Sequence, residues 1–421
     1  MKIVVRPAGE VRPVFPLLPS KLHTQLACSL SLLSREKVEV RSPLSCSETR
    51  VILKILEDLG FLIKRSASTW TIYPPDRITL AKKSLSVGSS ATALAMVSSA
   101  LSLFHISVVI TGDSSLRARR MSSLLSAFHK MGLDVHSTKR DDTPPFILFG
   151  GGACGGRVSL TVEEVRYLPA LALAALGTTE ETVLQLPAGE SKLFVEPILD
   201  IFGQARLRVE SMPGSLAFPK QAVSGFTCTI KEELSSSAPF IILLLLKGED
   251  VKAKLGRISG RDLLFLSLLR RFGVRVLQSR RSVRLVAGSI RGASADLSHT
   301  PELLPLLTVF ACFARGRSEI SGLEVARSSK SDRAQATFTA LRRLGANAVM
   351  YEDRMVIKGP CELDGGTVDG AGDYAVTAAL CVAGALAKNE VTISNGPEAL
   401  KQSYPSFISV LKQMGVDVSY G

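Results

Sequence analysis

One pattern of apolar and polar positions recurs six times along the chain. In each copy an amphipathic helix ends in a large apolar residue and a glycine, and a strand of alternating polarity follows. These glycines are Gly60, Gly132, Gly203, Gly273, Gly345 and Gly415. Their separations are 72, 71, 70, 72 and 70 residues. Because a glycine just past a helix readily takes the left-handed conformation that reverses the chain, each copy predicts a helix, a turn and a strand. Regular spacing over six copies indicates a repeated structural unit.

After each turn the pattern predicts a β-hairpin. In the fourth copy, strands at 274–277 and 282–286 flank the polar turn 279–281, and the fifth copy has strands at 348–350 and 355–357. An earlier, strongly apolar helix belongs to each copy, with examples expected at 170–176, 239–246, 303–314 and 375–387. Two helices and about four strands per copy predict sheets packed around buried helices, and six copies most simply form two three-copy domains. Substrates often bind in clefts between domains.

Composition excludes several classes of protein. With 46% hydrophobic and 21% charged residues, the chain is expected to be globular nearly from end to end. The apolar run 91–111 contains serines, threonines and a helix-to-strand switch, so we interpret it as buried core and expect no membrane contact. The N-terminus predicts a strand and carries no export signal. Seven cysteines without a C-x-x-C pair fit a reducing cytoplasm, and five scattered histidines predict no metal site.

The net charge of +13 implies an anionic partner, either nucleic acid or small phosphorylated and carboxylated molecules. Lysine and arginine are spread along the chain and aromatics make up only 6% of it, which disfavours nucleic acid.

Several predicted helices begin with serine or threonine, as expected of N-caps. Cations there are less expected. We place Arg117, Arg119 and Arg120 in one first turn, where the helix dipole opposes positive charge, so a phosphate or carboxylate ligand should offset them. The alternative is a chance triplet in a chain with 51 basic residues. Comparable positions elsewhere hold Lys21, Lys330 and Arg333.

Four colinear stretches carry a resemblance to the enolpyruvyl transferase family, and within it to the EPSP synthases. The stretch 112–119 reads Gly-Asp-Ser-Ser-Leu-Arg-Ala-Arg, close to the family's G-D-x-S-L-R-x-R. The others are 144–156, with its proline pair and glycines, 331–333 and 403–407. The family has sister enzymes with a reactive cysteine in the loop that matches 112–120. Since this chain has none there, the resemblance favours the shikimate branch.

The resemblance implies an α/β fold of two domains, each made of three βαβαββ units, with two chain crossings and a cleft between the domains. The expected domains are 18–230, and 1–17 plus 231–421. It also implies a reaction: the enolpyruvyl group of phosphoenolpyruvate moves to the 5-hydroxyl of shikimate 3-phosphate, and phosphate leaves, with no metal or organic cofactor. The expected partners are therefore these two small anions, with no nucleic acid and no membrane, for a monomeric cytoplasmic enzyme of aromatic amino-acid biosynthesis.

Residue by residue, the resemblance places Lys21 between both substrates. It assigns Arg119 and Arg333 to phosphoenolpyruvate and Ser191 to the shikimate phosphate. Glu302 falls where the family has an aspartate that accepts a proton, and a glutamate keeps the carboxylate one methylene further out.

Several family positions have changed. The replacements are Leu22, Leu26, Ala95, Arg166, Lys330, Ala375 and Gln402. Arg166, Lys330 and Lys401 are new or neighbouring cations, so we expect that positive charge has been relocated within the site.

Two alternatives remain open. One is a catalytically inactive relative that binds anions as a regulatory module, and the other is an RNA-end-processing enzyme, since RNA 3′-phosphate cyclases use related repeats. The latter should have a histidine near the C-terminus, whereas the last one is His299.

Overall fold

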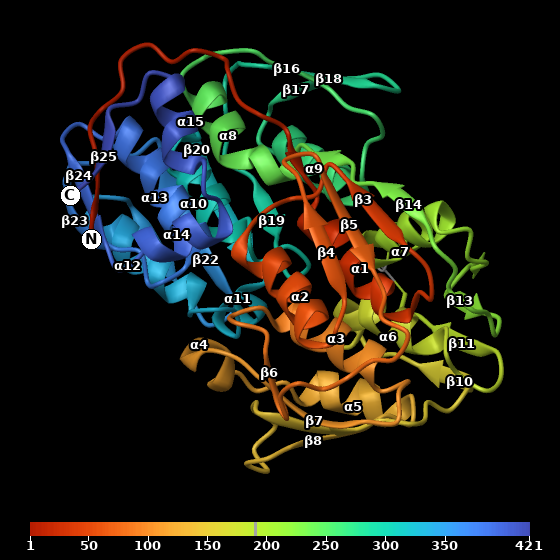
Figure 1. Ribbon diagram of the computed structural model, residues 1–421. Coiled ribbons are helices and arrows are strands. Elements are labelled where there is room, and N and C mark those ends of the chain that lie inside the picture. The colour runs from red at the N-terminus through yellow and green to blue at the C-terminus, as the bar shows by residue number, and fades with distance from the viewer. Residues whose placement is uncertain (189–191) are drawn as a thin grey trace. The chain divides into compact units, whose positions relative to one another are not determined.

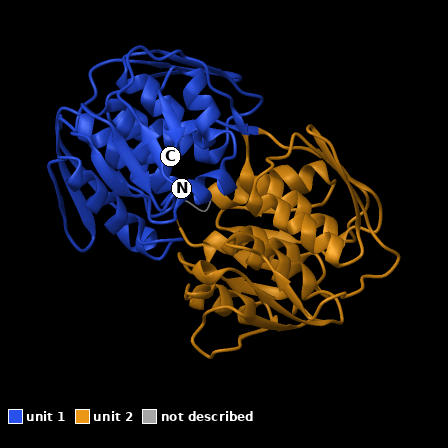
Figure 2. Cartoon of the chain, turned by 60° about the vertical axis from the view of Figure 1, so that its left-hand side comes forward, with its two compact units in different colours: residues 1–18, 232–421 blue, residues 19–231 orange. Residues whose placement is uncertain are grey.

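The structure is a computed structural model that describes residues 1–188 and 192–421. The chain divides into two compact units, which Figure 2 shows in separate colours. Unit 1 comprises Met1–Leu18 and Glu232–Gly421, and unit 2 comprises Pro19–Lys231. Unit 1 therefore contains both ends of the chain, and unit 2 is one continuous segment. Strands β2 (Leu18–Pro19) and β15 (Glu232–Glu233) lie where the chain passes from one unit to the other.

Unit 2 contains the first three copies of the repeat (Figure 1). The first consists of α1 (Lys21–Leu30), the 3₁₀ turn η1 (Ser31–Leu33), β3 (Val38–Arg41), α2 (Ser47–Asp58), β4 (Leu62–Arg65) and β5 (Thr69–Tyr73). The second consists of β6 (Ser84–Ser86), α3 (Ala91–Leu101), β7 (Ser107–Thr111), α4 (Ser114–Arg117), α5 (Ser122–Lys130), β8 (Asp134–Ser137) and β9 (Phe146–Phe149). The third consists of β10 (Gly156–Ser159), η2 (Val165–Tyr167), α6 (Leu168–Ala175), β11 (Thr182–Gln185), α7 (Lys192–Gln204), β12 (Glu210–Met212) and β13 (Ser215–Phe218). Strand β14 (Thr227–Thr229) pairs in parallel with β3 and completes the first copy.

Unit 1 contains the other three copies. The fourth consists of η3 (Ser235–Ser237), α8 (Ala238–Leu246), β16 (Val251–Lys254), α9 (Gly260–Arg271), β17 (Arg275–Gln278) and β18 (Ser282–Val286). The fifth consists of β19 (Ser294–Asp296), α10 (Leu304–Phe313), β20 (Gly316–Ser321), α11 (Leu323–Arg327), α12 (Arg333–Arg343), β21 (Ala348–Met350) and β22 (Arg354–Gly359). The sixth consists of β23 (Gly366–Asp369), α13 (Tyr374–Leu386), β24 (Val391–Ser394), α14 (Pro397–Ser403), α15 (Phe407–Gln413) and β25 (Val418–Tyr420), and β1 (Ile3–Val5) completes it between β24 and β25.

In each unit three apolar helices pack against one another at the centre, as the sequence predicts. In unit 2 these are α1, α3 and α6, and in unit 1 they are α8, α10 and α13. All eight residues of α6 are buried, which matches its all-round apolar sequence. The predicted hairpins are also confirmed, because β17 pairs with β18 and β21 pairs with β22. The apolar run 91–111 forms α3 and then β7, both as expected.

The predicted turn glycines are confirmed in five copies, where they adopt left-handed φ angles between +71° and +97°. The prediction for Gly203 is wrong, because this glycine lies inside α7 and Arg206 takes the left-handed position at φ +58°. The N–H of Leu207 donates to the carbonyl of Phe202 at 2.8 Å, the same six-residue closure that follows Gly132. The third repeat is therefore offset by three residues, which the even glycine spacing conceals.

The fourth copy has a three-stranded sheet, β16-β18-β17, whereas the other copies have four strands. Elsewhere a strand such as β6 or β19 pairs in parallel with the strand that follows the first helix. In unit 2 the corresponding strand of the first copy, β14, comes just before the chain leaves the unit. The equivalent segment of unit 1 contains Pro13 and Pro16, which have no N–H to donate and so do not extend a sheet. Within the described residues, no helix has the length and apolar character that crossing a bilayer requires.

Candidate active site

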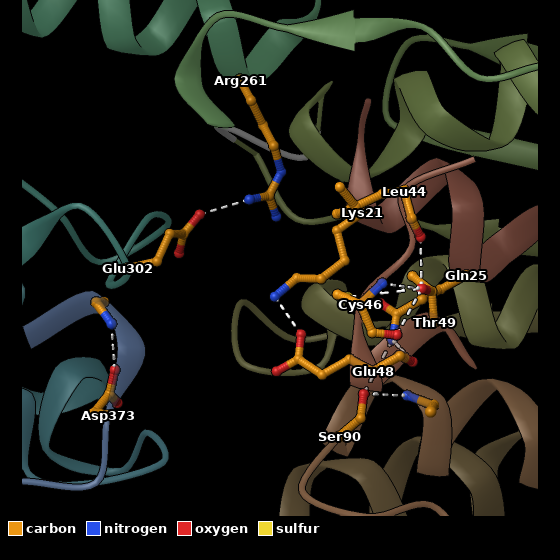
Figure 3. A network of polar contacts seen from close by, with 12 residues as sticks. Lys21, Gln25, Leu44, Cys46, Glu48, Thr49, Ser90, Arg261, Glu302 and Asp373 are labelled. Carbon is orange, nitrogen blue, oxygen red and sulfur yellow. Dashed lines mark hydrogen bonds and ion pairs between the residues drawn. The ribbon is translucent and has the colours of Figure 1, made fainter. Parts of the chain in front are cut away.

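In unit 2 one side chain of α1 holds the starts of two other helices. Helix α1 begins at Lys21 behind the N-cap Ser20, and α3 begins behind the N-cap Ser90, whose hydroxyl accepts from Ala93 N at 3.1 Å. Gln25 on α1 donates through Nε2 to Ser90 Oγ and to the backbone carbonyl of Glu48, both at 3.0 Å (Figure 3). The amide therefore fixes the starts of α2 and α3 against α1.

Lys21 lies at this junction and points toward Glu48, with which it forms an ion pair (Figure 3). Glu48 is in the first turn of α2, where a carboxylate is favoured by the helix dipole. The side chain of Lys21 is 31% exposed, so a ligand can reach it. Sequence reasoning found Lys21 but missed Glu48 and Gln25, because their roles depend on helix packing.

The prediction that Arg117, Arg119 and Arg120 share a helix's first turn is wrong for Arg119 and Arg120. Helix α4 is a single turn of four residues that ends at Arg117, so the other two arginines lie beyond it. Asp113 caps the helix by accepting from Leu116 N at 2.9 Å. The chain then leaves the helix before α5 begins, so the dipole argument for a ligand at this loop does not hold.

The remaining predicted residues of unit 2 lie in separate segments. Arg119 is half-buried between α4 and α5, and Arg166 is half-buried in η2, directly before the central helix α6. Ser191 lies outside the described residues. The resemblance-based roles of all three stay predictions.

In unit 1, Arg261 and Glu302 form an ion pair that sequence reasoning did not anticipate. Arg261 is the second residue of α9, and Glu302 lies two residues before α10. Arg261 Nη1 is 2.6 Å from Glu302 Oε1 (Figure 3), and the two side chains are 25% and 28% exposed. Burial tends to lower the pKa of Arg261, but the charges of Glu302 and Glu233 outweigh burial, and the pKa is raised. The guanidinium is therefore firmly cationic.

A second, more deeply buried pair joins Arg333 to Asp373. Arg333 begins α12 and is 7% exposed, and its Nε donates to Asp373 Oδ2 at 2.8 Å. Asp373 is the N-cap of α13 and accepts from Ala375 N at 2.8 Å. Burial alone would raise the pKa of Asp373, but Arg333 overcomes burial and the pKa is lowered. The Tyr374 ring centroid lies 5.7 Å from Arg333 Cζ.

These pairs belong to one cluster, which we call the unit 1 cluster. Its members are Glu233, Arg261, Glu302, Lys330, Arg333, Asp373 and Tyr374. The charge of Glu302 acts on both Arg261 and Arg333, and Lys330 acts on Asp373. The segments that lead into α8, α10, α12 and α13 therefore meet here. Guanidinium groups near helix starts are suited to binding phosphate and carboxylate, and Glu302 can serve as a proton acceptor.

Of the three expected relocated cations, Lys330 lies in the unit 1 cluster and Arg166 lies at the start of α6. Lys401 is exposed on α14, with Nζ 4.8 Å from the Tyr420 ring centroid and 3.6 Å from Met1 Sδ. Its role as a ligand stays a prediction. Arg261 could have been noticed from the sequence, because Ser259 and Asp262 have the spacing of a capping box and place Arg261 in a first helical turn.

One group in unit 2 has ligand atoms close enough for a metal ion. His23, Glu196 and Asp200 each offer an atom within 4.8 Å of the others. Lys231 forms an ion pair with Glu196, and its Nζ is 4.0 Å from Asp200 Oδ2. An ammonium therefore already accompanies these carboxylates.

Comparison with known proteins gives a family match over nearly the whole chain. The model of the family described as EPSP synthase (3-phosphoshikimate 1-carboxyvinyltransferase) matches residues 5–411. The 3-phosphoshikimate 1-carboxyvinyltransferase of Methanothermobacter thermautotrophicus is 28% identical over 427 residues, with 99% of each chain covered. The enzyme of that name from Chlamydia muridarum is 25% identical, covering 98% of this chain and 94% of its own.

Solved structures show the same fold. An EPSP synthase from Acinetobacter baumannii superposes with a TM-score of 0.81 at 20% identity, with both chains covered in full. The enolpyruvyl transferase NikO from Streptomyces tendae gives a TM-score of 0.81 at 16% identity, covering 100% of this chain and 98% of its own. These likenesses confirm the predicted α/β fold class.

Proposed function

This chain belongs to the EPSP synthase family, and on that premise we propose that it transfers the enolpyruvyl group of phosphoenolpyruvate to the 5-hydroxyl of shikimate 3-phosphate. The hydroxyl oxygen forms a new bond to C2 of phosphoenolpyruvate, the bond from C2 to the phosphate oxygen breaks, and the hydroxyl proton, first taken up by a carboxylate, leaves with the phosphate as hydrogen phosphate. The single observation that carries the proposal is the family match over residues 5–411. The expectations of a monomer and of a cytoplasmic location stay predictions.

We assign the acid–base step to the unit 1 cluster. Glu302 is the proton acceptor for the 5-hydroxyl, because its carboxylate lies at the surface of the cluster and is 28% exposed. Arg333 supplies a guanidinium group for phosphoenolpyruvate, and Lys330, one of the expected relocated cations, lies in the same cluster. Positioned cations stabilise developing charge without having to reorganise during the reaction.

Unit 2, taken by itself, also carries cations suited to anionic ligands. Lys21 is held by Glu48 at the joined starts of α1 and α2, and an anionic ligand would compete with Glu48 for its ammonium. Arg119 and Arg166 are half-buried and able to donate to phosphate. Ser191 keeps its resemblance-based assignment to the shikimate phosphate.

The test is product formation by the purified protein. Phosphoenolpyruvate and shikimate 3-phosphate are supplied together, phosphate release is followed by a coupled assay, and the enolpyruvyl product is identified by mass spectrometry. Reactions that lack either substrate are the controls. The proposal expects both products in equal amounts. Tight binding of shikimate 3-phosphate with no turnover would instead support the inactive, anion-binding alternative.

A further inference from the structure

We propose that Arg261 is the positioning residue for Glu302: its guanidinium fixes the direction of the carboxylate that accepts the proton. This inference rests on the proposed function, because it takes Glu302 to be the group that receives the proton of the 5-hydroxyl. It concerns a residue that the family resemblance did not point to.

The main chain that carries Arg261 is fixed on both sides. Asp262 N donates to Ser259 Oγ at 3.0 Å, and Ser259 N donates to Asp262 Oδ2 at 3.3 Å, forming a capping box at the start of α9. The other carboxylate oxygen of Asp262 accepts from Ser235 N at 2.9 Å. Ser259 and Asp262 are both fully buried. The guanidinium is thus anchored to a rigid first turn.

The backbone of Glu302 is fixed by its neighbours, but the direction of its side chain is set by Arg261. The neighbouring residues Thr300 and Leu303 are buried, and Leu303 N donates to the carbonyl of Thr300 at 2.9 Å. Within the described part of the chain, the hydrogen bond that the Glu302 carboxylate accepts comes from Arg261 Nη1. A glutamate has three side-chain torsions, so this one contact selects the direction of the carboxylate.

The neighbours of the pair determine what its loss would do. Glu233 and Tyr374 act on Arg261, and the charge of Glu302 also acts on Arg333. Arg333 is already engaged with Asp373. Without Arg261, the Glu302 carboxylate therefore loses the hydrogen bond that sets its direction. Proton transfer should then be slower, while the binding of both substrates should change little.

A purely structural ion pair would behave differently. Breaking a mostly buried pair lowers stability, and the loss of activity would be the same whether or not the Glu302 carboxylate is present. If Arg261 acts through Glu302, replacing Arg261 should have little further effect once Glu302 has been replaced, because residues that act as a unit have non-additive effects.

The experiment compares kcat and KM at pH 7 for the wild type, Arg261→Gln, Arg261→Lys, Glu302→Gln, the double variant of Arg261→Gln with Glu302→Gln, and Arg270→Gln. Arg270 lies on the same helix and is exposed, and Arg270→Gln removes the same charge, so this variant is the matched control. We expect Arg261→Gln to lower kcat by about tenfold with little change in KM, and by less than about twofold when Glu302 is already glutamine. Arg261→Lys should lie between Arg261→Gln and the wild type, and Arg270→Gln should match the wild type. An equal loss from Arg261→Gln in both backgrounds would overturn the proposal.

A second readout does not need turnover. Crystal structures of the wild type and of Arg261→Gln show the direction of the Glu302 carboxylate. In Arg261→Gln the carboxylate should turn away or occupy several conformers, and an unchanged carboxylate would refute the positioning role. If the wild type forms no product but the carboxylate turns in Arg261→Gln, the proposed function fails while the effect of Arg261 on Glu302 stands.

Discussion

Arg261 and Glu302, from the start of α9 and the approach to α10, meet in a 2.6 Å hydrogen bond between a guanidinium and a carboxylate. The two residues are 41 positions apart in sequence and belong to successive repeats. The contact joins the fourth and fifth copies at the point where the proposed proton acceptor stands. The hydrogen bond fixes the position of a carboxylate in the segment that precedes α10.

Replacing the Glu302 carboxylate should abolish most of the activity. Glu302→Gln keeps the size of the side chain but cannot accept a proton, so kcat should fall by about 10²–10⁴-fold with a smaller change in KM. Glu302→Asp restores the residue type that the family uses, and should retain more activity than Glu302→Gln. Steady-state kinetics with both substrates check this. A Glu302→Gln variant with wild-type kcat would remove Glu302 from the reaction.

The buried pair of Arg333 and Asp373 should be important for stability. Asp373→Asn leaves the 7%-exposed Arg333 without its countercharge, and we expect a loss of about 3–5 kcal/mol in the free energy of unfolding at pH 7. The exposed pair of Arg354 and Asp353 provides the control, and Asp353→Asn should change stability by less than about 1 kcal/mol. Urea unfolding measures both, and equal effects would contradict the burial argument.

The same pair predicts a pH dependence of stability. The pKa of Asp373 is lowered in the folded protein, so its contribution is present above the pKa of an unfolded aspartate, about 3.9, and is lost as the pH falls through the lower folded value. The stability difference between wild type and Asp373→Asn should therefore be constant from pH 5 to pH 7 and shrink below about pH 4. A difference that grows on acidification would show the opposite sign of shift.

The offset of the third repeat predicts that two equivalent-looking glycines respond oppositely to alanine. At Gly203 a Cβ meets nothing within 4 Å and the residue is helical, so Gly203→Ala should stabilise by about 0.5–1 kcal/mol. At Gly132, φ is +71° and a Cβ would lie 2.6 Å from Cys154 Sγ, so Gly132→Ala should destabilise by about 1–2 kcal/mol or more. Thermal unfolding of the two variants measures both effects. If Gly203→Ala were destabilising, Gly203 and not Arg206 would be the residue in the turn.

Cys361 should be unusually acidic for a thiol. A hydrogen bond from the Cys312 side chain lowers the pKa of Cys361 to about 6, against the opposing effect of burial, and Asn347 N also donates to its sulfur. Alkylation of Cys361 by iodoacetamide, followed by mass spectrometry, should therefore begin at a lower pH than alkylation of an ordinary thiol. In Cys312→Ala the onset of alkylation should move to higher pH. Alkylation of wild-type Cys361 that begins only above pH 8 would contradict this hydrogen bond.

The sequence predicts the scaffold well because periodicity is a local property repeated six times. The apolar run that forms α8 is buried in the core, and the alternating segments on either side of the polar turns pair as β17 with β18 and β21 with β22. The same local reasoning misplaced Gly203, because helix α7 continues past a glycine when the following residues favour helix.

The site is less predictable because its geometry depends on contacts between copies. Lys21 and Arg333 lie at helix starts as expected, but their partners Glu48 and Asp373 come from other helices. The helix-dipole argument for Arg117 failed because α4 ends after one turn. Arg261 was missed for a related reason: its neighbour Glu302 is distant in sequence.

The most direct test of the central claim is the direct observation of the enolpyruvyl product. Wild-type protein and Glu302→Gln are incubated with phosphoenolpyruvate and shikimate 3-phosphate, and mass spectrometry follows the acceptor. We predict that the wild type converts shikimate 3-phosphate to its 5-enolpyruvyl ether with one phosphate released per ether, and that Glu302→Gln does so at least about 100-fold more slowly. Unchanged shikimate 3-phosphate in the wild-type reaction, with folded protein and millimolar substrates, would contradict the assignment.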